Sequence, residues 1–176
     1  PAPIEDSYAA LVHMAANADE LLLDRARLVV AGMSAGGGLA AGLALAARDR
    51  NGPRLAGQLL MCPMLDERNS SFSSHQFVGL GLWDRESNDT GWNALLGDRR
   101  HTPAVTPYAS PSLAKDLSGL PPAFIDVGSM EVLRDEGVDY ALRLSAAGGD
   151  AELHLWPGGF HGFDITFPEA VLSQRA

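Results

Sequence analysis

Short apolar runs alternate along this chain with stretches in which apolar residues recur every three or four positions. The first pattern is typical of strands and the second of helices. Breakers such as Asn51-Gly52-Pro53 and Gly148-Gly149 separate the two. The pattern predicts strands over residues 28–33, 55–61, 123–127 and 152–156. It predicts helices over residues 5–23, 35–50, 92–96, 135–147 and 167–175.

The order of these elements predicts an α/β fold. Strands that alternate with helices form parallel sheets with right-handed crossovers, and a length of 176 residues suits one domain. The near-continuous apolar run at 55–61 is typical of a strand buried on both faces. Because loops that follow parallel strands gather at one edge of the sheet, we expect functional side chains in these loops.

Composition narrows the possible functions. The net charge is −9, from 13 Lys and Arg against 22 Asp and Glu, which leaves little for a basic patch, so we expect no nucleic-acid partner. No apolar stretch reaches ~18 residues and no basic and apolar leader opens the sequence, so we expect no membrane span, no signal peptide and a cytoplasmic location. The single cysteine, Cys62, lies in an apolar run and is expected to be a buried thiol.

The segment Gly32-Met33-Ser34-Ala35-Gly36-Gly37 carries the strongest chemical signal. It lies between a predicted strand and a predicted helix, which is the setting of a nucleophile elbow of the type Gly-x-Ser-x-Gly. So tight a turn requires small residues, here Gly32 and Gly36, on either side of the serine. Ser34 is therefore the candidate nucleophile, and the Ala35 N–H at the start of the helix is a candidate oxyanion donor.

A serine hydroxyl needs a base, and a third group must orient that base. His161 is the best candidate base because it follows the last predicted strand in a glycine-rich loop. For the acid we consider Asp126, Glu131, Asp135 and Glu136. Asp126 lies inside a predicted strand, while Asp135 and Glu136 are expected to cap a helix N-terminus. Glu131 lies in the loop itself and is the favoured acid, and Asp135 is the second candidate.

Three motifs together resemble the hormone-sensitive-lipase-like carboxylesterases. They are the elbow at 32–37, the segment Glu131-Val132-Leu133-Arg134-Asp135-Glu136-Gly137, and His161-Gly162-Phe163. The resemblance implies an α/β-hydrolase fold, the triad Ser34, Glu131 and His161, and short-chain carboxylic esters as substrates. Met33 stands where the family usually has Asp or Thr, and Glu131 stands where it usually has Asp.

The family's His-Gly-Gly-Gly motif, whose backbone N–H groups complete the oxyanion hole, does not occur in the sequence. We therefore expect residues 1–176 to be a single partial α/β-hydrolase domain without the cap, the first strands and this loop. A partial sheet exposes an apolar edge, so we expect a homo-oligomer or a missing N-terminal segment to cover it.

Candidate pocket residues are Met33, Trp83, Trp92, Phe160 and Phe163, of which the two phenylalanines flank His161 and the two tryptophans could equally fill the core. We expect neither a metal nor a cofactor. No His, Cys and carboxylate spacing is typical of a metal site, and Gly36-Gly37-Gly38 is not followed by the Gly-Lys-Ser/Thr of a P-loop. Two alternatives to an esterase stay open: a weak or inactive hydrolase fragment that acts as a small-molecule binding module, and an amidase with the same triad.

Overall fold

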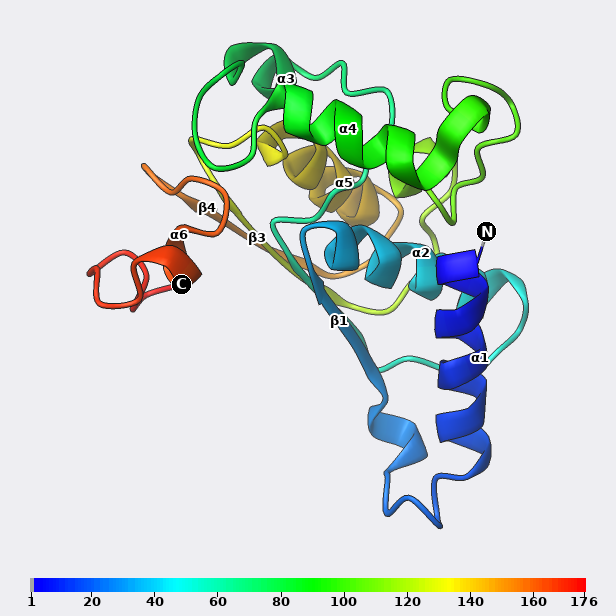
Figure 1. The fold of residues 1–176 in the computed structure, drawn as a ribbon. Helices are drawn as coiled ribbons and strands as arrows, with labels where there is room; N and C mark the ends of the chain where they lie inside the picture. Colours follow the sequence, from blue (N-terminus) through cyan, green and yellow to red (C-terminus); the bar gives the residue numbers. More distant parts are fainter. Residues whose placement is uncertain (1) are drawn as a thin grey trace.

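A parallel sheet forms the centre of the computed structural model, which describes residues 2–176 (Figure 1). Within these residues the sheet has four strands, in the order β1 (Val29–Met33), β2 (Gly57–Met61), β3 (Ala123–Gly128) and β4 (Ala151–Trp156). All neighbouring strands are parallel. The predicted α/β class and the strand positions are confirmed, although β2 begins at residue 57 rather than 55.

Six α-helices are present in the described residues. They are α1 (Ala2–Ala16), α2 (Ala35–Asp49), α3 (Phe72–Gln76), α4 (Arg85–Leu96), α5 (Arg134–Ala146) and α6 (Phe163–Thr166). Short 3-10 turns occur at Arg25–Arg27, Gly97–Arg99 and Pro111–Leu113. The helices α3 and α4 belong to the long excursion between β2 and β3, which lies beyond the carboxyl ends of the strands (Figure 1).

Two predicted helices differ clearly in their boundaries from the structure. The first helix ends at Ala16 rather than residue 23, and at this end the Asn17 side-chain amide and the Asn17 N–H both donate to the His13 carbonyl oxygen (2.8 and 3.0 Å). The fourth helix begins at Arg85 rather than residue 92, because the Asp84 carboxylate accepts the Ser87 N–H (2.9 Å) as an N-cap.

The last predicted helix, over residues 167–175, is absent from the structure. Turns follow α6, and Phe167 and Val171 are exposed. A helix gains most of its stability from packing an apolar face, and most residues of this segment are exposed.

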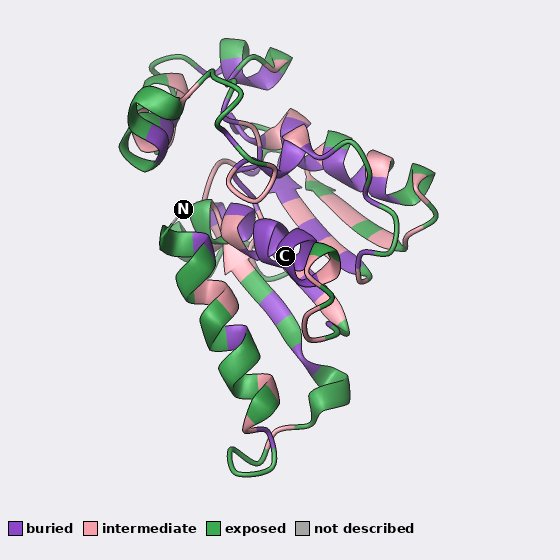
Figure 2. Cartoon of the chain, turned by 90° about the vertical axis from the view of Figure 1, so that its right-hand side faces the viewer, coloured by how far each residue is buried: buried purple, intermediate pink, exposed green. Residues whose placement is uncertain are grey.

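The helix α2 connects β1 to β2 and is buried almost all round (Figure 2). Its sequence consists largely of Gly and Ala, which lets backbone segments approach it closely. A Cβ on Gly38 would lie 2.0 Å from the Met64 carbonyl oxygen, and one on Gly42 would lie 2.1 Å from the Tyr108 carbonyl oxygen. The loops after β2 and before β3 are thus fixed against this helix.

The main core lies between the sheet and the crossover helices. Right-handed crossovers between strands in sequential order place α2 and α5 on the same face of the sheet. There they cover the inward side chains of the two central strands, such as Leu60 and Ile125, which are fully buried. The strand β1 lies at one edge of the four-stranded sheet, and its Val29 is 57% exposed. Among residues 2–176, no helix is long and apolar enough to cross a bilayer; the cytoplasmic location stays a prediction.

Candidate active site

Ser34 lies in the sharp turn between the end of β1 and the start of α2. Its φ of 56° and ψ of −120° are values that non-glycine residues rarely adopt, so the backbone is strained there. Two hydrogen bonds to the segment that follows β2 hold the turn. The Ser34 N–H donates to the Met61 carbonyl oxygen (2.9 Å), and the Ser34 carbonyl oxygen accepts the Met64 N–H (2.9 Å).

The two glycines of the elbow have different steric roles. A Cβ on Gly32 would lie 2.1 Å from the Gly36 carbonyl oxygen, so no other residue fits there without a backbone shift. Apart from its chain neighbours and the backbone of its own helix, a Cβ on Gly36 would meet no atom of residues 2–176 within 4 Å. The expectation that both positions must be small therefore holds for Gly32, whereas the described residues impose no such limit at Gly36.

His161 and Glu131 lie beside this serine. The imidazole Nε2 of His161 is 3.0 Å from the Ser34 Oγ, and its Nδ1 is 2.7 Å from the Glu131 Oε2. An ionised carboxylate can only accept hydrogen bonds, so the Nδ1 of His161 carries the proton. Its Nε2 is then free to accept a hydrogen bond from the Ser34 hydroxyl. The other oxygen of Glu131 accepts the Gly128 N–H (2.6 Å). The structure thus brings together the three predicted side chains from three strand-end loops, in the order that a base relay requires.

Ala35 is the first residue of α2, so its N–H has no acceptor within the helix. The helix dipole adds partial positive charge at this end. An oxygen that becomes negative next to Ser34 would be stabilised by both. Ala35 therefore lies where an oxyanion donor is needed.

A family model described as the α/β-hydrolase fold matches residues 1–165, which is nearly the whole chain. The chain belongs to the α/β-hydrolase family. The resemblance to the hormone-sensitive-lipase-like carboxylesterases is thereby confirmed.

Several curated relatives of this chain are named as esterases or as hydrolases. Carboxylesterase NlhH of Mycobacterium tuberculosis is 44% identical over 97% of the chain, and an acetyl-hydrolase of Streptomyces hygroscopicus is 33% identical over 99%. Among solved structures, a bacterial heroin esterase superposes with a TM-score of 0.96 at 45% identity over 99% of the chain. The chain spans 55% of the length of NlhH, 58% of the acetyl-hydrolase and 56% of the heroin esterase.

The other carboxylates considered for the hydrolase triad have different partners. Asp126 accepts the Trp156 indole N–H (3.2 Å), and burial raises the pKa of its carboxyl. The predicted helix-capping role of Asp135 and Glu136 was wrong, because both reach other segments. Asp135 accepts the Ser73 N–H (2.7 Å), and Glu136 accepts the Leu65 N–H (2.7 Å).

A cavity of about 540 Å³ extends from the N-terminus of α2 toward its C-terminus, beneath α4. Its wall is mostly apolar and includes Leu39, Met64, Trp92, Leu96 and Val105. Of the predicted pocket residues, Trp92 lines this cavity, whereas Met33, Trp83, Phe160 and Phe163 do not. No periodic signal in the sequence indicated this wall as a whole, because it is assembled from α1, α2, α4 and the irregular excursion around α4.

Three of the other predicted pocket residues border a separate, much smaller cavity. Met33, Phe160 and Phe163 border a cavity of only about 10 Å³ beneath Glu131, which is too small for a substrate. The Trp83 ring lies against His161, with 6.2 Å between the ring centroids. Trp83 is therefore the predicted pocket residue that the structure places beside the candidate base.

Sequence reasoning identified Cys62 as a buried thiol, which is confirmed, but missed its position beside the triad. Cys62 follows the end of β2 and adopts a φ of 36°. Burial raises the pKa of its thiol, and the nearby carboxylates of Glu131 and Asp126 raise it further. The thiol is therefore neutral near pH 7, and a role as nucleophile is disfavoured.

Proposed function

We propose that the chain carries the catalytic triad of a serine esterase that hydrolyses short-chain carboxylic esters, with Ser34 as nucleophile, His161 as base and Glu131 as orienting acid. The observation that carries the proposal is the continuous pair of contacts from Ser34 Oγ to His161 Nε2 (3.0 Å) and from His161 Nδ1 to Glu131 Oε2 (2.7 Å). The name of the related acetyl-hydrolase supports a short acyl group.

In this mechanism the Ser34 hydroxyl transfers its proton to His161 Nε2 as Oγ attacks the ester carbonyl carbon. The carbonyl oxygen becomes negative and accepts the Ala35 N–H. His161 then returns the proton to the leaving alcohol, which leaves an acyl group on Ser34. Water enters by the same route and releases the acid. Glu131 keeps Nδ1 protonated and stabilises the imidazolium through the buried contact.

Hydrolysis of a p-nitrophenyl acyl ester tests this assignment, with Ser34→Ala as the matched control. We expect release of p-nitrophenol by the parent and loss of release in the variant. Release that persists in the variant would exclude Ser34 as nucleophile. The corresponding p-nitroanilide tests the amidase alternative, because the triad itself does not choose between ester and amide.

We further propose that residues 1–176 are a partial catalytic domain, and that more polypeptide covers the β1 edge and supplies further oxyanion donors. The support is that the chain spans 55% of the length of NlhH and that Val29 is exposed on the edge strand. Each oxyanion donor is worth roughly 10²–10³ in turnover, so the remaining donors matter for activity.

Amide hydrogen exchange along Val29–Met33, together with the intact and native mass, tests this second proposal. If these amides are protected from exchange and the intact mass is well above 18.6 kDa, further polypeptide of the same chain covers the edge. If they are protected and the native mass is that of a dimer of 18.6 kDa chains, a second copy covers it. Rapid exchange of the amides that face away from β2 would contradict coverage of this edge.

A further inference from the structure

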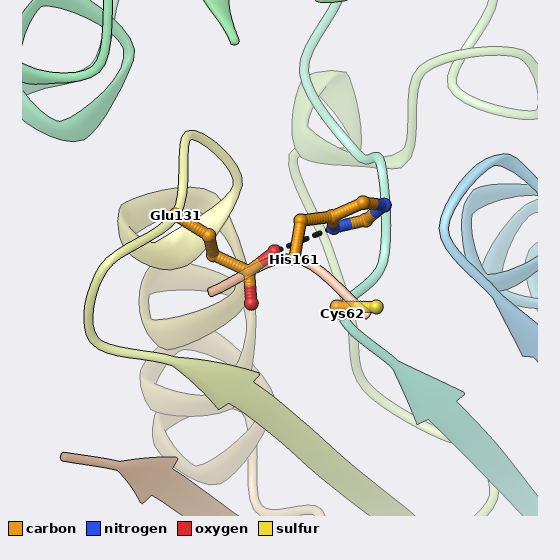
Figure 3. Close-up of side chains that lie close together, drawn as sticks. All are labelled: Cys62, Glu131 and His161. Carbon is orange, nitrogen blue, oxygen red and sulfur yellow. Dashed lines mark hydrogen bonds and ion pairs between the residues drawn. The ribbon is translucent and has the colours of Figure 1, made fainter. Parts of the chain in front are cut away.

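Three side chains that bind metals well meet beneath the imidazole of the candidate base. Cys62, Glu131 and His161 each place one potential ligand atom within 4.8 Å of the other two. They come from the loops after β2, β3 and β4, and Figure 3 shows the Cys62 thiol and the Glu131 carboxylate on the same side of the His161 ring. No sequence spacing indicated a metal site, because 30 to 99 positions separate these residues in the chain, from 131 to 161 and from 62 to 161.

We infer that this cluster binds a thiophilic divalent cation, such as Zn²⁺ or Cd²⁺, and that the bound ion switches off the catalytic base. The binding site stands on the geometry alone, whereas the inhibitory effect rests on the proposed function. The ion is an inhibitor here and not a cofactor of the reaction.

The donor set matches such ions. Thiolate selects soft and borderline cations, imidazole suits zinc, and hard ions such as Mg²⁺ prefer oxygen ligands in octahedral sites. Bonds of about 2.3 Å to sulfur and about 2.0–2.2 Å to nitrogen and oxygen place tetrahedral ligand atoms roughly 3.3–3.6 Å apart. The 2.7 Å contact between Glu131 and His161 must therefore open, and the widest separation, up to 4.8 Å, must close by about 1 Å.

Space and charge favour a cation at this place. A cavity of about 10 Å³, about the volume of one small probe sphere, borders Cys62, Glu131 and Asp126. His161 does not line this cavity, so its ring must shift toward it for all three side chains to reach one ion. Cys62 is 8% exposed and Glu131 is 2% exposed, so the charges of a thiolate and a carboxylate would be poorly solvated without a counterion. A divalent ion compensates for both, and the Cys62 thiol releases its proton to solvent.

The consequence for the base is the same whichever ring nitrogen is the ligand. An ion on Nε2 takes the lone pair that accepts the Ser34 proton. An ion on Nδ1 replaces the bond to Glu131, and the neutral imidazole then carries its proton on Nε2 and cannot accept another. Ser34 loses its base in both cases.

Titration of the purified protein with Cd²⁺, followed by thiolate-to-metal charge-transfer absorption, tests the site without reference to activity. Cys62 is the only cysteine, so the band reports on it alone. We expect one ion per chain, and we expect Glu131→Gln and His161→Ala each to weaken binding by at least ~10-fold, since even loss of an outer-shell partner costs 10–100-fold. His154→Ala removes an imidazole outside the cluster and should leave the affinity unchanged. Absence of the band, or a band whose affinity survives both cluster variants, would overturn the inference.

Inhibition is a separate measurement. We expect Cd²⁺ to abolish hydrolysis of a p-nitrophenyl ester by the parent, whereas Cys62→Ala, checked for folding by its melting curve, keeps activity in the presence of the ion. Mg²⁺ should inhibit neither protein. Equal inhibition of parent and Cys62→Ala would overturn the inhibitory role. If the parent shows the charge-transfer band but hydrolyses no ester, the proposed function fails while the metal site stands.

Discussion

Replacing Glu131 by Gln tests how the acid controls the base, because the change keeps the shape of the side chain and removes one acceptor. In the parent, one carboxylate oxygen accepts the Gly128 N–H (2.6 Å) and the other accepts from His161 Nδ1 (2.7 Å). Glutamine has a single oxygen. If this oxygen stays on the Gly128 N–H, its NH₂ group faces Nδ1, and His161 must move its proton to Nε2.

The magnitude follows from this change of tautomer. A His161 that carries its proton on Nε2 donates to the Ser34 Oγ and cannot act as its base. In triads where the acid is made neutral without loss of geometry, turnover falls about 10⁴-fold. That factor corresponds to about 5 kcal/mol of transition-state stabilisation. The lost charge-assisted hydrogen bond also lowers the free energy of unfolding, by about 1.5–3 kcal/mol.

The assay is the rate of p-nitrophenol release from a short-chain ester, with a melting curve to show that each variant is folded. Glu152→Gln is the matched control, because Glu152 forms a 2.7 Å contact with His154 that is exposed and remote from Ser34. We expect no change in that variant. A Glu131→Gln protein that is folded and turns over within tenfold of the parent would refute the role of Glu131.

Three further predictions follow from burial and close contacts. Gly38→Ala should lower the free energy of unfolding by about 1–3 kcal/mol, since the new Cβ would lie 2.0 Å from the Met64 carbonyl oxygen. Gly36→Ala should leave the free energy of unfolding unchanged, and urea unfolding measures both variants. Burial raises the pKa of Glu136 well above 4.5, so its contribution to stability is present below pH 4.5 and lost as the pH rises through the folded pKa. Glu136→Gln should therefore gain free energy of unfolding relative to the parent at about pH 8 and lose this advantage near pH 4.5; an advantage independent of pH would contradict the reasoning. The buried, neutral Cys62 thiol should react with iodoacetamide only after denaturation, and rapid alkylation of the folded protein would show that the thiol is accessible.

The sequence was sufficient for the elements whose signal is local. The apolar runs of β2 and β3 and the breaker at 51–53 predicted the alternating order of the sheet. The predicted burial of the 55–61 strand on both faces was wrong, because only alternate residues of β2 are buried and the others are half-exposed. The excursion between β2 and β3 was not predictable in this way. Its helices depend on caps such as Asp84 and on contacts with distant segments, for example Ser73 with Asp135.

The triad residues could be predicted because each follows a strand, and strand ends meet at one edge of a parallel sheet. Distances within the site could not be predicted, because they depend on the register of β2, β3 and β4. For the same reason Cys62 could be identified as buried but not as a neighbour of Glu131 and His161. The large cavity beneath α4 was also missed, since its wall combines residues from several separate elements.

The central claim is that Ser34 is a nucleophile activated by His161. Its most direct test is reaction with a fluorophosphonate, followed by mass spectrometry of the intact chain and of its peptides. We predict one adduct per chain, located on Ser34, and much slower labelling of His161→Ala, whereas His154→Ala is labelled at the parent rate. No adduct, an adduct on another residue, or equal labelling of parent and His161→Ala would contradict this claim.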